Sequence, residues 1–326
     1  MRIVFFSTKP YDKDFFEKYN QTHELIFHEV ALSEQSVRLA EGADGVCVFV
    51  NDKLNAVVID ALKNLGIRII ALRCAGFNNV DTEAARKAGI KVVRVPAYSP
   101  HAVAEHALAL IMTLNRKTHK AYNRVREGNF SLEKLTGFDL YHKTVGVVGT
   151  GKIGGVFARI MLALGCQVLA YDKFPDESLA AAGVKYIELQ DLLAQADIVS
   201  LHCPLSDSTH HLINRQALAQ MKKGVMLINT SRGGLIDTQA VIEALKDKTV
   251  GYLGIDVYEQ EENIFFNDLS EQVLQDDTLA RLMTFPNVLI TSHQGFLTEE
   301  ALSQIALITL QNISDFQNGL PLVNEI

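Results

Sequence analysis

The chain has 326 residues, of which 48% are hydrophobic and 21% charged, and its formal net charge is -7. This length, about twice the commonest domain size, predicts one large or two ordinary globular domains. The negative charge argues against nucleic acid or an anionic membrane surface as a partner. No apolar run approaches the roughly 18–20 residues of a membrane span. The 4 cysteines form no CxxC pair, and residues 1–6 lack a signal-peptide pattern, which favours a cytoplasmic location.

Strand-like and helical patterns alternate along almost the whole chain. In chain order, the expected strands are 3–6, 45–50, 67–74, 91–95, 144–148, 167–171, 198–202, 225–229, 251–256 and 288–291. The helical patterns between them include 57–64, 82–88, 154–164 and 239–246. This alternation predicts α/β architecture, with parallel sheets that are covered by helices on both faces.

The number of strands indicates two sheets, because about ten strands exceed what one open sheet commonly holds. Pro96 and Pro100 bracket the start of a long helical pattern and mark the boundary. The last helical pattern, 298–318, follows the final strand and is expected to pack back on the first half. We therefore expect two doubly wound parallel-sheet domains with the active site in the cleft. Residues 1–99 and 296–326 would form one domain, and residues 100–295 the other.

A glycine-rich loop directly follows the expected strand 144–148. Gly149, Gly151 and Gly154 form the pattern G-x-G-x-x-G, which is a weak signal alone because many such loops only turn. Here it lies between a strand and a helix, which is the context of a dinucleotide-binding fingerprint with the pyrophosphate at the helix N-terminus. Asp172 ends the next strand, where an acid accepts the ribose hydroxyls of NAD and repels the extra phosphate of NADP. Lys173 beside it leaves NADP open, and a methylated-sulfonium cofactor is an alternative for the loop alone.

Polar residues follow three other expected strands, at the edge where ligands bind in open α/β sheets. Arg232 lies in a glycine-flanked loop, Asp256 ends its strand, and His293 follows the last strand. Alone, Arg232 would most simply form a structural ion pair, and His293 would be a satisfied histidine. Together beside a dinucleotide loop, they suit hydride transfer to a 2-keto acid. The arginine would hold the carboxylate and polarise the carbonyl, and the imidazole would donate a proton.

The segment DVYEQEE holds four carboxylates, those of Asp256, Glu259, Glu261 and Glu262. A carboxylate beside the imidazole of His293 would favour its protonated form and fix its orientation. Spacing does not choose between Glu259 and Glu261, because an extended segment aims both to the same side. A metal site made by Asp256, Glu259 and Glu261 is an alternative, and it would make the activity sensitive to chelators.

Several motifs together resemble the D-isomer-specific 2-hydroxyacid dehydrogenases over essentially the whole chain: VGVVGTGKIG, HCPL, INTSRGGLID, GIDVYEQE and SHQGF. RCAGFNNVD, VPAYSPHAVAEHALALIMTLNRK and FFNDLSEQVLQDD are most similar to the bacterial fermentative D-lactate dehydrogenases of that family. The resemblance implies a Rossmann-type NAD domain, a flavodoxin-like, discontinuous substrate domain, and reduction of pyruvate to D-lactate with NADH and no metal. It also implies a homodimer, or a homotetramer, in which the segment from about 101 to 141 is exchanged around a two-fold axis.

The resemblance further implies roles for individual residues. Arg232 would bind the substrate, and His293, paired with Glu261, would donate the proton, whereas Glu259 and Glu262 would face solvent. Asp256 would accept the nicotinamide carboxamide. Substrate contacts are implied at Ala75, Gly76, Tyr98 and Arg232, and cofactor contacts at Gly149, Gly151, Lys152, Ile153, Gly154, Asp172, His202, Cys203, Pro204, Thr209, Thr230, Ser231 and Asp256.

Two positions depart from the family pattern. Glu262 stands where many members have proline, and Gly295 stands where the lactate enzymes have alanine. Two alternative functions stay open. One is reduction of another 2-keto acid, such as hydroxypyruvate or phenylpyruvate, and the other is an NAD-sensing binding protein of the same fold.

Overall fold

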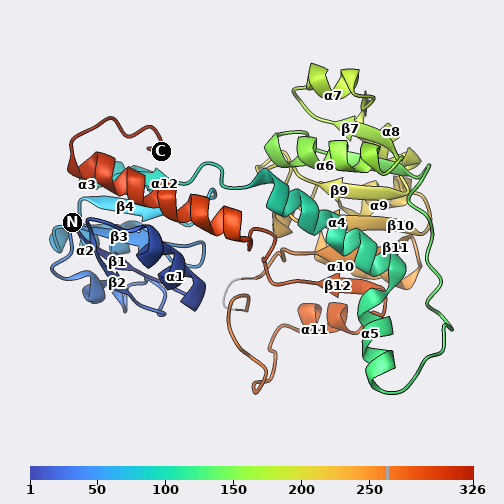
Figure 1. The fold of residues 1–326 in the computed structure, drawn as a ribbon, viewed down its shortest axis with the longest axis horizontal. Helices are drawn as coiled ribbons and strands as arrows, with labels where there is room; N and C mark the ends of the chain where they lie inside the picture. The colour runs from blue at the N-terminus through green and yellow to red at the C-terminus, as the bar shows by residue number, and fades with distance from the viewer. Residues whose placement is uncertain (262–263) are drawn as a thin grey trace. The chain divides into compact units, whose positions relative to one another are not determined.

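The computed structural model describes residues 1–261 and 264–326 (Figure 1). The chain divides into two compact units, one made of Met1–Ser99 with Leu297–Ile326 and the other of Pro100–Phe296. Each unit contains one sheet in which all paired strands are parallel. The prediction of two parallel α/β domains is confirmed. Among the described residues, no helix is long and apolar enough to cross a membrane.

The first unit is built on a five-stranded sheet of order β2-β1-β3-β4-β5, which is the flavodoxin-like order. All residues of β3 and β4 are buried, because helices cover both faces of the sheet. The late helix α12 packs against α1 and β4, so the two chain segments of the unit share one core. The elements are β1 (Arg2–Phe5), α1 (Pro10–Tyr19), β2 (Glu24–Phe27), η1 (Val37–Ala40), β3 (Gly45–Val48), α2 (Ala56–Asn64), β4 (Ile69–Leu72), α3 (Thr82–Ala88), β5 (Lys91–Arg94) and α12 (Glu299–Gln317).

The second unit is built on a seven-stranded sheet of order β12-β11-β10-β9-β6-β7-β8, a Rossmann-type order with one further strand. Two helices, α4 (Pro100–Arg116) and α5 (Thr118–Arg126), precede the sheet. The remaining elements are β6 (Thr144–Val148), α6 (Lys152–Ala163), β7 (Gln167–Tyr171), α7 (Glu177–Ala181), β8 (Lys185–Tyr186), α8 (Leu189–Gln195), β9 (Ile198–Leu201), α9 (Arg215–Gln220), β10 (Val225–Asn229), η2 (Gly233–Leu235), α10 (Thr238–Lys246), β11 (Val250–Ile255), α11 (Asp277–Met283) and β12 (Val288–Ile290).

Strand β10 shows how the second sheet fills a core on each face. Successive side chains of a strand point to opposite faces. Leu227 accordingly packs with residues of α8, α9 and α10, whereas Met226 and Ile228 pack with residues of α4 and α6. An uninterrupted apolar run therefore marks a strand that is buried on both faces.

The parallel arrangement brings the carboxyl ends of the strands to one edge of the second sheet. Val148 at the end of β6 is paired with Leu201 of β9, and Asn229 at the end of β10 is paired with Ile255 of β11. Ile255 is also paired with Ile290, the last residue of β12. The loops that leave these strands therefore start side by side, although they are far apart in the sequence.

Candidate active site

A side chain at each of the three glycines in the loop after β6 would have a different effect. Gly149 has a φ of +91°, and a Cβ there would lie 2.6 Å from the backbone nitrogen of Cys203. A Cβ at Gly154 would lie 1.9 Å from the carbonyl oxygen of Gly149. At Gly151, the N-cap of α6, a Cβ would meet nothing within 4 Å. The first N–H groups of α6 have no acceptor inside the helix, so this open surface can receive an anion.

Asp172 follows β7 and holds the glycine loop in place. Its Oδ2 accepts hydrogen bonds from the Thr150 backbone nitrogen at 2.6 Å and from the Thr150 hydroxyl at 3.2 Å. Its Oδ1 accepts from the backbone nitrogen of Phe174 at 2.8 Å. The Tyr186 hydroxyl donates to the Thr150 hydroxyl at 2.9 Å and so connects β8 to the same loop. The carboxylate is therefore fixed beside the glycine loop, where a ribose would lie.

Polar side chains of the loop after β9 form hydrogen bonds with other groups of the second unit. Nε2 of His202 lies 2.8 Å from the Ser200 hydroxyl. Burial lowers the pKa of His202 to about 3, so the ring is neutral at physiological pH. The Thr209 hydroxyl donates to the carbonyl of Pro204 at 2.7 Å and closes the following turn. The exposed ring of Pro204 leaves an apolar surface at the sheet edge.

The loop after β10 presents one arginine and one unsatisfied hydroxyl. Thr230 is buried, and its Oγ1 has no hydrogen-bond partner in the part of the chain that the structure describes. The Ser231 hydroxyl donates to the Cys203 carbonyl at 2.7 Å, which joins this loop to the one after β9. The Arg232 carbonyl accepts from the Asn229 side chain at 2.8 Å, while its half-buried guanidinium donates to the Ser231 carbonyl at 2.7 Å.

His293 and Glu261 form the predicted pair. Nδ1 of His293 lies 2.9 Å from Oε1 of Glu261, and the two side chains are 19% and 24% exposed. The other oxygen of Glu261 accepts from the backbone nitrogen of Tyr258 at 3.0 Å. The carboxylate therefore directs the proton-bearing Nδ1 toward itself and leaves Nε2 available for proton transfer.

Asp256 fixes the loop that carries His293. Its carboxylate accepts from the Thr291 hydroxyl at 2.5 Å and from the backbone nitrogens of Gln294 and Gly295 at 2.9 and 2.8 Å. Nε2 of His106, on α4, lies 3.2 Å away. Burial alone would raise the pKa of Asp256, but the hydrogen bonds from His106, Thr291 and Gln294 outweigh it and hold the pKa below its usual range. The role of Asp256 toward nicotinamide stays a prediction.

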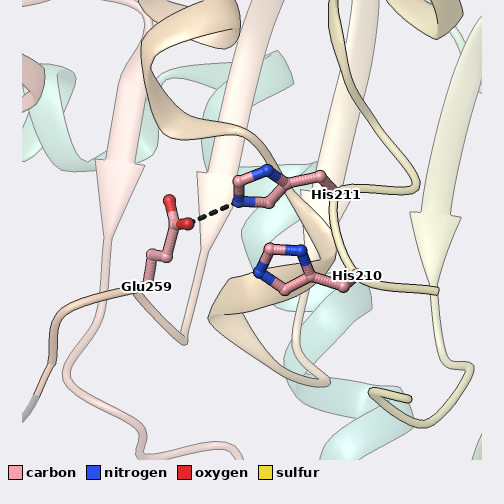
Figure 2. Close-up of side chains that lie close together, drawn as sticks. All are labelled: His210, His211 and Glu259. Atoms are coloured by element: carbon pink, nitrogen blue, oxygen red, sulfur yellow. Dashed lines mark hydrogen bonds and ion pairs between the residues drawn. The ribbon is translucent and has the colours of Figure 1, made fainter. Parts of the chain in front are cut away.

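The expectation that Glu259 faces solvent is wrong. Nε2 of His211 lies 2.5 Å from its Oε1, and the Thr238 hydroxyl donates to its Oε2 at 2.9 Å (Figure 2). Nothing in the local pattern marks this pair, because His211 lies in the loop after β9. Glu262 lies outside the described residues. Asp256, Glu259 and Glu261 do not together form a group whose ligand atoms converge as in a metal site among the described residues.

The loop after β4, in the first unit, contains Ala75 and Gly76. The Arg94 guanidinium donates to the Ala75 carbonyl at 2.7 Å and lies 5.0 Å from the ring centroid of Phe77. The amide N–H groups of residues 75–77 donate to no acceptor among the described residues. Successive free amides of this kind can donate hydrogen bonds to an anion. Sequence reasoning missed Arg94, whose signal is a charged residue at the end of a buried strand. Tyr98 follows β5 in the same unit.

Comparisons with known proteins agree on one family. Residues 108–295 match the family described as D-isomer specific 2-hydroxyacid dehydrogenase, NAD binding domain. The chain is 51% identical to a D-lactate dehydrogenase of Escherichia coli, with 100% of both chains covered. It is 54% identical to the 2-hydroxyacid dehydrogenase A of Aspergillus oryzae, over 97% of this chain and 92% of that protein. A solved structure described as the pyruvate reductase of Chlamydomonas reinhardtii matches with a TM-score of 0.95 and 48% identity, over 99% of this chain and 98% of that one.

Proposed function

The chain belongs to the D-isomer-specific 2-hydroxyacid dehydrogenase family and carries its NAD-binding domain, and on this premise we propose that it is a D-lactate dehydrogenase that reduces pyruvate. The observation that carries the proposal is the His293–Glu261 pair at 2.9 Å, at the sheet edge that also presents Arg232 and the glycine loop. The family and the cofactor predicted from the sequence are confirmed.

The second unit fits NAD in three respects. Gly151 leaves the N-terminus of α6 open to a pyrophosphate, and Asp172 is fixed where a ribose would lie. The buried Thr230 hydroxyl lacks a partner among the described residues and can bond a polar group of the cofactor. When bound, NADH supplies the hydride that reduces C2 of the keto acid. Residues 100–295 would thus form the NAD domain, and residues 1–99 and 296–326 the substrate domain.

In this proposal His293 supplies the proton. Its Nε2 carries the proton to the carbonyl oxygen, while Glu261 on Nδ1 orients the ring and stabilises the charged imidazolium. Arg232 balances the substrate carboxylate and polarises its carbonyl through charge-assisted hydrogen bonds. The bond from Asn229 to the Arg232 carbonyl fixes the backbone from which the guanidinium extends.

The first unit would contribute a cradle for the substrate carboxylate. The free amides of residues 75–77 provide donors for an anion. The guanidinium of Arg94 donates a hydrogen bond to the Ala75 carbonyl and adds a positive charge near the amides. The Ala75 carbonyl is thus engaged by Arg94, whereas the amides of residues 75–77 remain available to the ligand. Tyr98, which follows β5 in the same unit, would line the substrate pocket and so help to select the size of the keto acid.

We also propose that the protein is a cytoplasmic homodimer, with a homotetramer of paired dimers as the alternative. All four cysteines are free, as is typical of a reducing compartment. Five apolar side chains on α5 and in the segment after it are more than half exposed, and a partner subunit would cover them. They are Tyr122, Val125, Phe130, Leu132 and Tyr141. Sedimentation of the wild type and of Leu132→Ser would test this, because loss of the interface should release monomers.

The test of the function is NADH oxidation with pyruvate, hydroxypyruvate and phenylpyruvate, together with the chirality of the product. We expect pyruvate to give the highest kcat/KM, with D-lactate as product. Faster reduction of a larger acid would assign another keto acid as the substrate. Turnover below about 0.01 per second on every acid, against ~1–10³ per second for typical enzymes, would instead indicate an NAD-sensing binding protein.

A further inference from the structure

Two neighbouring histidines and a glutamate converge outside the proposed catalytic pair. His210 and His211 come from the loop after β9, and Glu259 from the segment after β11. One potential ligand atom of each lies within 4.8 Å of the others, and no other such group occurs among the described residues. Figure 2 shows both imidazole rings with a nitrogen facing the Glu259 side. We propose that these three residues form a binding site for a divalent transition-metal ion, with Zn²⁺ as the reference ligand.

The ion pair between His211 and Glu259 does not by itself explain the position of His210. The imidazole of His210 makes no hydrogen bond with the described residues, yet it stacks on the His211 ring with centroids 3.9 Å and planes 23° apart. His211 has a φ of +50°, a backbone conformation that L-residues seldom adopt. This conformation lets two consecutive side chains lie on the same side, where an extended chain would separate them. The local backbone thus holds a second imidazole beside the one that contacts Glu259.

The carboxylate of Glu259 is oriented as a ligating carboxylate would be. Its Oε2 accepts from the Thr238 hydroxyl at 2.9 Å, which leaves Oε1 facing the imidazoles. Hydrogen bonds of this kind from residues outside the ligand set fix the orientation of metal ligands. The backbone nitrogen of His211 donates to the Gly234 carbonyl at 2.8 Å, so the histidine loop is fixed as well. Both segments therefore provide ligands from supported positions.

The donor set selects the class of ion. Two imidazole nitrogens and one carboxylate oxygen suit Zn²⁺, and the same set suits Co²⁺, Ni²⁺ and Cu²⁺, whereas Mg²⁺ and Ca²⁺ prefer oxygen ligands alone. Bonds of about 2.0–2.2 Å place tetrahedral ligand atoms roughly 3.3 Å apart. The 2.5 Å contact between His211 and Glu259 must therefore open slightly, while His210 moves inward. The ion replaces the hydrogen atom of that contact as the partner of His211 Nε2 and Glu259 Oε1.

The site adjoins the segment that holds the proposed catalytic glutamate. A Cβ at Gly233 would lie 2.4 Å from the backbone nitrogen of Glu259, so the loop of Arg232 packs directly on this segment. The backbone nitrogen of Tyr258, one residue before Glu259, donates to Glu261. A cation that moves Glu259 out of its present contact with His211 would therefore disturb Glu261, and we expect it to lower kcat. This kinetic consequence rests on the proposed function, whereas the binding of the ion does not.

Calorimetric titration of the full chain with Zn²⁺ tests the binding, and Co²⁺ gives a visible spectrum of its ligands. We expect one ion per chain for the wild type. His210→Ala keeps the His211–Glu259 contact but removes one ligand, and it should weaken binding by at least about tenfold. Glu259→Gln should weaken it similarly, while the control His142→Ala, at an exposed histidine elsewhere in the unit, should bind like the wild type. The Co²⁺ spectrum should lack a thiolate band, because the cysteines are buried.

Two results would overturn the site: no saturable Zn²⁺ binding by the wild type, or equal affinity in the wild type and His210→Ala. The kinetic arm compares kcat with and without Zn²⁺, followed by EDTA. Inhibition of the wild type that is absent in His210→Ala, and reversed by the chelator, supports the coupling to Glu261. Equal inhibition of both proteins contradicts it. If no keto acid is turned over, the proposed function fails, and the titrations alone decide whether the metal site exists.

Discussion

Replacement of Glu261 by glutamine tests the proton-donor arrangement most directly. The carboxylate uses one oxygen for Nδ1 of His293 and the other for the backbone nitrogen of Tyr258. Glutamine has only one oxygen acceptor. If that oxygen keeps the Tyr258 bond, the amide NH₂ faces Nδ1 and excludes the doubly protonated imidazolium. If the amide turns over, two N–H groups meet at buried Tyr258, so either orientation loses one hydrogen bond.

The size of the effect follows from the bond that is lost. A hydrogen bond to a charged group contributes about 1.5–3 kcal/mol, and about 1.4 kcal/mol corresponds to a factor of ten in rate. The side chains are 19% and 24% exposed, so solvent screens this bond only in part. We therefore expect Glu261→Gln to lower kcat about 10- to 100-fold for pyruvate, and to leave the KM for NADH near its wild-type value.

The assay is steady-state NADH oxidation over a range of pH. Without the carboxylate, the charged form of His293 is less stabilised, so the alkaline limb of the kcat profile should move to lower pH. Glu259→Gln is the comparison, because it removes a carboxylate that contacts His211 and Thr238 and should leave that limb in place. An unchanged rate and unchanged limb in Glu261→Gln would refute the pairing. The same shift in both variants would refute the assignment between the two glutamates.

Three further substitutions test other parts of the proposal. Asp172→Ala should raise the KM for NADH about tenfold and relax the discrimination against NADPH, and kinetics with both cofactors would contradict the role of Asp172 if the preference were unchanged. Arg94→Lys should raise the KM for pyruvate about tenfold with a smaller change in kcat, because the bond to the Ala75 carbonyl is weakened; a KM within twofold of the wild type would contradict the cradle. For His202, the unfolded chain takes up a proton below the ordinary pKa of 6.5, whereas burial keeps the folded ring neutral to about pH 3. The stability that the neutral ring provides is therefore lost as the pH falls, by about 2 kcal/mol between pH 7 and pH 5. Urea unfolding of His202→Gln at both pH values should lack this loss, and equal pH dependence in the two proteins would contradict it.

Strands that are buried on both faces are the easiest to predict from the sequence. β3, β4, β9 and β10 are fully buried and consist mostly of apolar residues, and such runs are visible without any tertiary information. The two strands missed, β2 and β8, both lie at a sheet edge, where only one neighbour is present. β8 has two residues, and no residue of β2 is fully buried. Their pairing is imposed by the neighbouring strand, so periodicity cannot reveal it.

Some features of the candidate site could likewise be predicted from the sequence, and others could not. Gly149, Asp172 and His293 could be predicted because each lies within three residues after the end of a mostly apolar strand, and parallel strands end at one edge. The contact of Glu259 with His211 could not be predicted, because it joins two loops whose distance in space depends on the order of the strands in the sheet. Spacing alone left the choice between Glu261 and Glu259 open, and the family resemblance made it. In the structure the turn after β11 aims the two side chains at different histidines.

The discontinuity of the first unit bears on how the chain is made. Helix α12 packs against α1 and β4, and the backbone nitrogen of residue 326 donates to β5, so the sheet of the first unit is covered by residues that are synthesised after the second unit. Residues 100–296, which form the contiguous second unit, leave the ribosome between the two halves. Domains usually fold as they emerge, from the N-terminus onward. Here that order is inverted: the nucleotide-binding half can be complete while the earlier-made sheet still exposes an apolar face to the cell's chaperones.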